Sequence, residues 1–503
     1  MKRIAFKAIP GCVGKLVSNI ELVLSHPDIA KLKDILQAKN TSAAWKLRQA
    51  DKSLIFYQNK MISLQHLAID ESSDLYTDTA SKIDLLEAQT LELKDQLVEI
   101  FYLENDDGTL SVPAGFWWLC ERIEGDRHLN KELPSYKLPG LRPYQIEGLD
   151  ALYKYRRGTI ELATGLGKSK MIISAALAGL KTKKRVMIIV PTEYLVGQMY
   201  KEIKLLHENT TAIGGDYKHP KLGWDIMVIT MASAPKFIDM ATMLILDEAH
   251  HSPAATWAEL LSSATDATHV YNFTATAFRS DGLDLAIHSF GGPVVFSRDA
   301  RWGLNNNWLS PVTIVQIRIH PRRPDGGKVY VSDETMATSA YKQLMAQENI
   351  IQLIKDKTLT ALAKGRKEML IFKTVKMAEY FKKAVSTELK FQVAHADKSK
   401  TKNPKYPLHQ FSKGESNLLV ACVNLVSEGI DIPDCNFLMV CTQHSGDITT
   451  LQLLGRALRK APGKENAVVI DIAVKGYKQF EGAAAKRLAI YKYLCDNVIE
   501  VDL

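Results

Sequence analysis

Short, unbroken runs of apolar residues recur along the chain from about residue 136 to its end. The clearest lie at 186–190, 226–229, 243–246, 369–372, 418–421, 437–440 and 467–470. Runs of four or five apolar residues are typical of parallel strands that are covered on both faces. Segments of helical length separate them. The pattern therefore predicts two tandem α/β units, at residues 136–310 and 311–503.

Residues 1–135 mix helical patterns with short apolar runs around a turn, which predicts an N-terminal α+β accessory domain. Helical patterns lie near residues 20–38 and 81–93. A hairpin is expected where an Asn-Asp-Asp-Gly turn at 105–108 joins apolar runs at 97–103 and 109–112. A helix carrying four apolar side chains at 116–119 should follow. Its aromatic residues are interpreted as core or interdomain packing rather than as a platform for stacked bases.

Composition narrows the class of protein only slightly. A length of 503 residues allows two to four domains, and a net charge of +8 permits a polyanionic partner without requiring one. The six cysteines form no CxxC pair, which argues against a zinc site or a disulfide framework. No apolar run reaches the roughly 20 residues needed to span a bilayer, and no hydrophobic stretch follows Lys2 and Arg3. We expect a cytoplasmic protein, or a host-cytoplasmic one if a phage encodes it.

The most informative motif is Ala-Thr-Gly-Leu-Gly-Lys-Ser at residues 163–169. Its glycines allow a tight turn whose N–H groups point at phosphate oxygens, and the following helix adds its dipole. Lys168 would reach the β- and γ-phosphates, and Ser169 would ligate Mg²⁺. Leu162 stands where the usual pattern has glycine, so a simple turn before a helix is the alternative. The expected nucleotide-binding residues are Thr164, Gly165, Leu166, Gly167, Lys168 and Ser169.

A second motif, Asp-Glu-Ala-His at residues 247–250, directly follows the apolar run at 243–246. Ligands of α/β proteins bind at the carboxyl ends of strands. Asp247 is therefore expected to hold Mg²⁺, and Glu248 to orient and deprotonate the attacking water. Ordinary capping of a helix is the alternative interpretation. The position of the motif behind its own strand, 79 residues after Lys168, favours the catalytic one.

Two further groups support a nucleotide site. Arg142 and Gln145 precede the phosphate loop, and the amide of Gln145 has the donor and acceptor needed to recognise an adenine edge. The alternative interpretation is that Arg142 and Gln145 simply mark the start of a helix. Arg456 and Arg459 lie three residues apart on one helical face and suit the charge of a transferring phosphoryl group. The alternative interpretation is that the two arginines form salt bridges along the surface of a helix.

In their order along the chain these motifs resemble those of superfamily 2 helicases and translocases, whose motor consists of two RecA-like domains with ATP between them. The matching segments are 142–145, 163–169, 191–198, 229–232, 247–250, 273–282, 369–375, 427–433 and 452–459. The resemblance covers residues 136–473. The family usually has proline at the position of Ala277, so the loop there is expected to be less rigid.

The resemblance implies the cofactors ATP and Mg²⁺ and several further roles. Gln452, Arg456 and Arg459 would act catalytically from the second domain onto ATP held by the first. Thr274 and Thr276 would couple the state of ATP to domain closure. The remaining residues implied are Gly429 and Asp431 near ATP, and Thr192, Thr230 and Arg279 on the nucleic acid.

The Asp-Glu-Ala-His sequence at residues 247–250 and the order of the segments along the chain are similar to those of the XPB and RadD group and of phage UvsW-type branch-migration helicases. This implies a motor acting on branched DNA, such as forks and Holliday-type junctions, with residues 1–135 engaging the duplex. An RNA helicase or a restriction-system motor is the alternative. A nucleic-acid-binding protein with an ATP switch and no unwinding is a third possibility. Basic residues within 317–331 indicate either a strand-separating hairpin or an ordinary interdomain linker.

Overall fold

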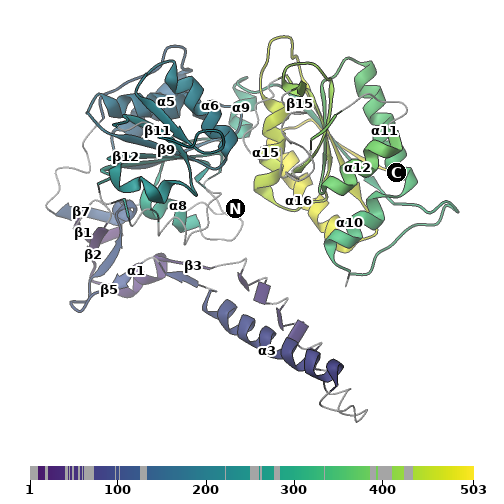
Figure 1. The fold of residues 1–503 in the computed structure, drawn as a ribbon, viewed down its shortest axis with the longest axis horizontal. Coiled ribbons are helices and arrows are strands. Elements are labelled where there is room, and N and C mark those ends of the chain that lie inside the picture. Colours follow the sequence, from purple (N-terminus) through teal and green to yellow (C-terminus); the bar gives the residue numbers. More distant parts are fainter. Residues whose placement is uncertain are drawn as a thin grey trace.

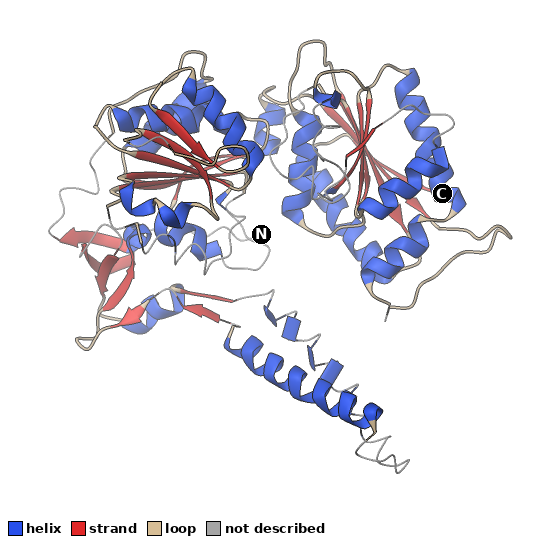
Figure 2. Cartoon of the chain, viewed as in Figure 1, coloured by secondary structure: helices blue, strands red, loops and turns tan. Residues whose placement is uncertain are grey.

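Two α/β lobes lie side by side in the computed structural model, and an N-terminal part lies next to the first lobe (Figure 1). Helices flank the central sheet of each lobe (Figure 2). The structure describes residues 9–16, 21–39, 73–96, 98–100, 102–124, 133–220, 223–249, 266–276, 284–333, 335–385, 392–394, 410–423 and 434–503, with residues 260, 263 and 264 and scattered residues between 43 and 61.

The sheet of the first lobe has, among the described residues, seven strands in the order β10-β11-β9-β12-β13-β8-β14, all paired in parallel. Most are buried along their whole length, which explains their continuous apolar runs. The strands are β8 (Arg157–Leu162), β9 (Val186–Val190), β10 (Thr210–Ile213), β11 (Ile226–Thr230), β12 (Met243–Asp247), β13 (His269–Thr274) and β14 (Val294–Arg298).

Helices cover both faces of this sheet. Successive side chains of a strand point to opposite faces, so strands that are apolar throughout need a covering layer on each face. One core contains Ile188 and Ile245 together with side chains from the first three helices named below. Another contains Ile189 and Leu246 together with Ile287. The helices are α4 (Pro143–Tyr153), α5 (Lys168–Leu180), α6 (Glu193–Lys204), α8 (Asp284–Gly291) and α9 (Ala300–Asn305), with 3-10 turns η2 (Ala234–Lys236) and η3 (Ile238–Met240).

The second lobe repeats this architecture. Its described strands form a parallel sheet in the order β17-β18-β16-β19-β20-β15-β21. The strands are β15 (Val312–Ile319), β16 (Glu368–Phe372), β17 (Gln392–Ala394), β18 (Leu418–Cys422), β19 (Phe437–Cys441), β20 (Ala467–Val474) and β21 (Val498–Asp502). Two tandem parallel-sheet lobes are thus confirmed.

Helices also cover both faces of the second sheet. The face that shares a core with the first lobe carries α15 and α16, whereas the other face carries α10, α11 and α12. These helices are α10 (Ala337–Met345), α11 (Glu348–Ala363), α12 (Val375–Val385), α15 (Asp447–Leu458) and α16 (Lys478–Leu494). Within the described part of the chain, no helix is both long and apolar enough to cross a membrane.

The N-terminal part contains a small sheet of order β5-β6-β2-β1-β7 and a separate pair, β3-β4. The strands are β1 (Ile9–Leu16), β2 (Glu21–Ser25), β3 (Gln37–Lys39), β4 (Val98–Ile100), β5 (Leu103–Glu104), β6 (Leu110–Pro113) and β7 (Cys120–Glu124). The helices are α1 (Ile29–Ile35), α3 (Asp74–Asp95) and the 3-10 helix η1 (Ala114–Leu119). Leu285 and Ala286 of α8 belong to the same core cluster as this sheet, so the small sheet packs directly on the first lobe.

Two sequence expectations for this part need correction. The helix expected over residues 20–38 is shorter, α1, and lies between the strands β2 and β3. In the expected hairpin only β5 and β6 pair across the turn, because residues 98–100 pair with β3 instead. The turn itself is present, with Gly108 at a φ of 77°. Trp117 stacks on Tyr155 of the first lobe at 4.9 Å, which supports interdomain packing.

A buried ion pair fixes the architecture of the second lobe. Arg487 of α16 and Asp471 of β20 have fully buried side chains, and two guanidinium nitrogens lie 2.9 and 3.0 Å from the carboxylate oxygens. A further guanidinium N–H donates to the carbonyl oxygen of His444, 2.6 Å away, just before α15. Gln316 of β15 also donates to Asp471. One charge pair thus connects α16, two strands and the turn that begins α15.

Arg487→Met is expected to lower the free energy of unfolding by about 3–5 kcal/mol, because it leaves the carboxylate of Asp471 buried without its cation. Lys492→Met on the same helix is the matched control, since its ion pair with Glu500 is exposed and contributes at most about 1 kcal/mol. Urea unfolding of both variants measures the difference. Equal midpoints for the two variants would contradict this assignment.

Candidate nucleotide site between the lobes

The phosphate loop connects the end of β8 to the start of α5. Gly165 and Gly167 have φ angles of 92° and 85°, a left-handed conformation that other residues rarely adopt. Gly167 is the N-cap of α5, so the loop brings backbone N–H groups to the positive end of the helix dipole. Thr164, Lys168 and Ser169 line the cavity beside the loop. This geometry suits a bound phosphate chain.

Two acidic residues face the loop from the end of β12. The ammonium of Lys168 lies 2.8 Å from a carboxylate oxygen of Glu248, and both side chains are largely buried. The backbone N–H of Glu248 donates to the carboxylate of Asp247 at 3.0 Å. Glu248 has a φ of 50°, a strained conformation that is often found at functional sites.

The charges of this cluster influence one another. Burial raises the pKa of Asp247 to about 7, and the neighbouring Glu248 carboxylate adds to the increase, whereas Lys168 opposes it. A carboxyl group that is costly to ionise in the free protein gains from a nearby cation. The position of Asp247 therefore favours a ligand that carries positive charge, such as a divalent metal ion.

Residues at the start of α4 support the loop from behind. The amide nitrogen of Gln145 donates to the carbonyl oxygens of Leu166 and Gly167, at 3.0 and 3.1 Å. Its amide oxygen accepts the backbone N–H of Arg142 at 2.8 Å. Tyr144 also donates to Leu166. Both N–H groups of Gln145 are thus used within the protein, and recognition of adenine by this side chain stays a prediction.

Two tryptophans near this position were not anticipated from the sequence. The guanidinium of Arg142 lies 5.2 Å from the ring centre of Trp308, and the ring of Tyr144 meets both Trp302 and Trp308 edge-on. These residues come more than 150 positions later in the chain, so no local pattern connects them to Arg142. They hold the start of α4 against the segment that leads to the second lobe.

The second lobe contributes Gln452 and Arg456 of α15 and Arg459, which directly follows the helix, to the same cavity. The expectation that both arginines lie on one helical face is wrong, because the backbone of Arg459 is extended with a ψ of 137°. These three side chains line the cavity together with Lys168 and Glu248, and its volume is about 330 Å³. Burial lowers the pKa of Arg456 to about 10 and also lowers that of Arg459, while the negative charge of Glu248 opposes both shifts. The structure therefore brings the expected cations and carboxylates of the two lobes to one site.

Close backbone contact holds α15 against the phosphate loop. A Cβ atom at Gly455 would lie 2.5 Å from the Cβ atom of Thr164, and one at Gly165 would lie 3.2 Å from the Cγ atom of Arg459. The backbone N–H of Ser310 donates to the carbonyl oxygen of Leu458 at 2.7 Å, which ties the linker to the end of α15. A glycine is required at position 455 because no side chain fits there.

Other predicted residues lie elsewhere. Thr192 caps α6, and its hydroxyl accepts the N–H of Leu195, while the buried Thr230 at the end of β11 donates to Ser233. Both lie at carboxyl ends of strands, away from the nucleotide cavity. Gly429, Asp431 and Arg279 lie outside the described residues, as do His250, residues 277–282 and the whole of segment 427–433.

One wall of the cavity comes from α6. Leu195, Gln198 and Glu202 line it, and the amide nitrogen of Gln198 lies 3.3 Å from a carboxylate oxygen of Glu202. Gln198 belongs to segment 191–198, which the family resemblance matches without implying a role for this side chain at the nucleotide. The three residues have helical spacing on one face, and their helix starts at the carboxyl end of β9. That spacing and placement are the sequence signal that could have indicated this wall.

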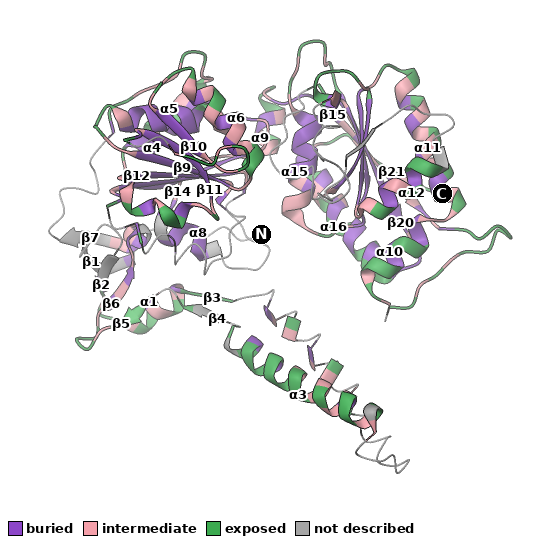
Figure 3. Ribbon diagram, viewed as in Figure 1, coloured by how far each residue is buried: buried purple, intermediate pink, exposed green. Residues whose placement is uncertain are grey.

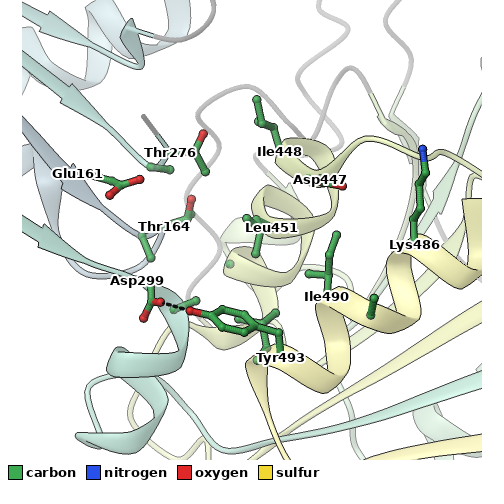
Figure 4. Close-up of a pocket in the computed structure, with 16 residues that line it drawn as sticks. Glu161, Thr164, Thr276, Asp299, Asp447, Ile448, Leu451, Lys486, Ile490 and Tyr493 are labelled. Atoms are coloured by element: carbon green, nitrogen blue, oxygen red, sulfur yellow. Dashed lines mark hydrogen bonds between the residues drawn. The ribbon is translucent and has the colours of Figure 1, made fainter. Parts of the chain in front are cut away.

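A second cavity, of about 620 Å³, shares Ala163 and Thr164 with the first as lining residues (Figure 4). Thr276 and Glu161 of the first lobe face Ile448 and Leu451 of α15 across it. A hydrogen bond of 2.6 Å from the hydroxyl of Tyr493 to Asp299 crosses between the lobes at its edge. One side of α15 therefore lines the nucleotide cavity and another lines a cavity beside Thr276, so a shift of this helix changes both.

The fold and the site together define a class of protein: a nucleoside triphosphatase built from two RecA-like lobes with the nucleotide site between them. Residues 138–279 match the family described as "Type III restriction enzyme, res subunit", and residues 347–461 match "Helicase conserved C-terminal domain". The chain belongs to the superfamily 2 helicases and is an ATP-dependent helicase.

Individual relatives are distant. The chain is 24% identical to "DNA 3'-5' translocase XPB2" of Sulfurisphaera tokodaii over 74% of this chain and 90% of that protein. The DNA-bound type ISP restriction-modification enzyme LlaBIII shares the fold over 73% of this chain and 32% of its own, at 15% identity and a TM-score of 0.52. UvsW of phage T4 is matched over 98% of this chain and 99% of its own, at 14% identity. The TM-score of that match is 0.40.

Gly455→Ala is expected to reduce the kcat of ATP hydrolysis about tenfold to a hundredfold, because the new methyl group displaces α15 and its arginines from the phosphate loop. Gly482→Ala in α16 is the matched control, since no atom lies within 4 Å of that position. It should leave kcat unchanged and stabilise its helix by up to about 1 kcal/mol. A wild-type kcat for Gly455→Ala would show that turnover does not need this contact.

Proposed function

We propose that the chain hydrolyses ATP between its lobes to move along DNA, and that it thereby unwinds or branch-migrates forks and Holliday-type junctions. The observation that carries the proposal is the single cavity that Lys168 and Glu248 of the first lobe share with Arg456 and Arg459 of the second. A nucleotide in this cavity would bridge the lobes, so its hydrolysis would release one lobe from the other.

The residues present suit ATP with Mg²⁺. Lys168 and the turned backbone of the loop would hold the β- and γ-phosphates, and a phosphate oxygen would replace Glu248 as the partner of the ammonium group. The Ser169 hydroxyl and the Asp247 carboxylate offer the oxygen ligands that Mg²⁺ prefers. The raised pKa of Asp247 fits this role, because a nearby divalent cation would stabilise its ionised form.

The remaining polar side chains of the cavity suit the chemical step. Glu248, once separated from Lys168, would orient and deprotonate the attacking water. Arg456 and Arg459 would stabilise the charge on the transferring phosphoryl group, and Gln452 would help to position the water. Since the two arginines belong to the other lobe, hydrolysis would depend on closure of the lobes.

DNA is proposed as the track for two reasons. One relative over most of this chain is named a DNA translocase. Thr192 after β9 and Thr230 at the end of β11 also lie at the carboxyl edge of the first sheet, and the family resemblance places strand phosphates at these positions. Arg279 is proposed to contribute to the same track.

Selection of branched DNA is proposed to involve the N-terminal part. Its small sheet shares a core with α8, so it is fixed to the lobe that holds the phosphate loop. A rigid attachment would let this part hold duplex DNA while the motor draws on one strand. The proposal for branch migration itself rests on the resemblance to UvsW-type helicases in the layout of the sequence.

Lys168→Ala and Glu248→Gln are each expected to reduce the kcat of ATP hydrolysis by about 10²–10⁴-fold or more. Glu248→Gln should retain ATP binding, whereas Lys168→Ala should weaken it, since of these two side chains the lysine is the one proposed to bind the phosphates. Lys137→Ala and Glu147→Gln, in exposed ion pairs of the same lobe, are matched controls. Retained hydrolysis in both active-site variants would refute the catalytic assignment.

ATPase stimulation should be greatest with forked DNA, lower with single-stranded DNA and lowest with RNA of the same length. Strand separation on a labelled fork and a Holliday-type junction should require ATP. Stronger stimulation by RNA would support an RNA helicase instead. Stimulation by DNA without strand separation or branch movement would indicate a linear translocase or an ATP-dependent binding switch.

A further inference from the structure

A basic hairpin, residues 320–331, projects from the second lobe between β15 and α10. Arg322 and Lys328 pair as an antiparallel bridge, and the N–H of Arg323 donates to the carbonyl oxygen of Gly327 at 2.8 Å. Gly326 closes the turn with a φ of 86°. The loop that leads into α10 is largely exposed (Figure 3). Because β15 is an inner strand of the sheet, this segment is a hairpin of the lobe and not the interdomain linker.

The base of the hairpin is held firmly on the lobe. The side chain of Asn349 in α11 accepts the N–H of Arg322 at 2.9 Å and donates to the carbonyl oxygen of His320 at 2.8 Å. On the other side, the N–H of Val331 donates to the carbonyl oxygen of Gly476 at 2.8 Å. A Cβ atom at Gly476 would lie 2.4 Å from the carbonyl oxygen of Val329, so the hairpin is closely seated.

The tip carries cations that the protein does not neutralise. Arg322, Arg323 and Lys328 are exposed, and within the described part of the chain none of them forms an ion pair. Asp325, the acidic residue between them, accepts the N–H of Gly327. At the base, by contrast, Arg318 pairs with acidic groups on β21. The tip is therefore a positively charged surface without an internal partner.

An exposed aromatic ring lies beside these cations. Tyr330 is 65% exposed, and its ring centre is 5.7 Å from that of His320. Burial lowers the pKa of His320, the positive charges of Lys328, Lys475 and Arg322 lower it further, and the carboxylate of Glu481 opposes them. A large aromatic ring exposed among cations is the combination on which unpaired bases stack while phosphates bind alongside.

The hairpin lies at the edge of the sheet where the nucleic-acid segments are expected. All strands of the second sheet run parallel, so β15, β16 and β20 end at one edge. Lys373 and Thr374 directly follow β16, within a segment that the family resemblance matches. β16 is three strands from β15, a separation of about 14 Å at the usual strand spacing. A strand crossing this edge therefore comes within reach of the tip.

We propose that the hairpin is a further DNA-contact site. Arg322, Arg323 and Lys328 bind consecutive phosphates of the strand that leaves the motor, and Tyr330 stacks on one of its unpaired bases. This inference rests on the proposed DNA motor and adds a contact point for single-stranded DNA beyond the tracking residues. Neither the nucleotide cavity nor the cavity beside Thr276 includes any of these four residues.

The test is a triple variant, Arg322→Ala with Arg323→Ala and Lys328→Ala, measured as the full chain. Its affinity for a fork with single-stranded arms should fall about tenfold or more. The slope of log affinity against log salt should fall by about two to three, since each lost phosphate contact removes about 0.7–0.9. ATP hydrolysis without DNA should stay unchanged. A double variant at the opposite sheet edge, Lys364→Ala with Lys413→Ala, is the matched control.

Tyr330→Ala tests the stacking of a base on this ring separately from the binding of phosphates by the cations. It should weaken binding to single-stranded DNA about tenfold, leave blunt duplex binding unchanged and keep the wild-type salt slope. A wild-type salt slope in the triple variant, or an equal loss in the control, would overturn the proposal for the hairpin. If wild-type ATPase responds to no DNA at all, the proposed motor itself fails, and the two failures are thereby distinguished.

Discussion

The contact between α15 and the phosphate loop is the constraint on which the rest of the site depends. Gly455 allows the helix backbone to approach Thr164 more closely than any side chain would permit. This approach places Arg456 and Arg459 of the second lobe in the same cavity as Lys168 of the first lobe. A site that is completed across an interface responds to the relative position of the lobes, which is the property a motor needs.

The electrostatics of the cavity explain why it would attract a charged ligand. Lys168 and Glu248 partly neutralise each other, while Asp247 and the arginines are buried with pKa values shifted toward their neutral forms. Burial makes the ionised forms of these side chains costly. A polyphosphate with a divalent cation would bring charges of both signs into the cavity, so binding would stabilise the ionised forms of Asp247 and of the arginines. The strained backbone at Glu248 is consistent with such a poised site.

Sequence patterns predicted the two parallel sheets because fully buried strands appear as unbroken apolar runs, as in β9, β12 and β16. They failed where burial is partial: residues 20–38 formed two short strands around α1. Within the site, the loop and the carboxylates follow local motifs. The bracing of the loop by Gln145, the contact of Trp308 with Arg142 and the wall formed by α6 depend on tertiary packing between distant segments, which no local pattern encodes.

The parallel sheets also explain how ATP and nucleic acid would occupy separate places yet influence each other. All strand ends of a lobe lie at one edge, so the phosphate loop after β8 and Thr192 after β9 move as one body. In the second lobe, the buried pair of Arg487 and Asp471 likewise ties the start of α15 to β20, whose neighbour β15 leads into the basic hairpin. Closure of the two lobes around a nucleotide would therefore be transmitted to the carboxyl edge of each sheet. The elements between move as rigid bodies, because packed interiors deform little.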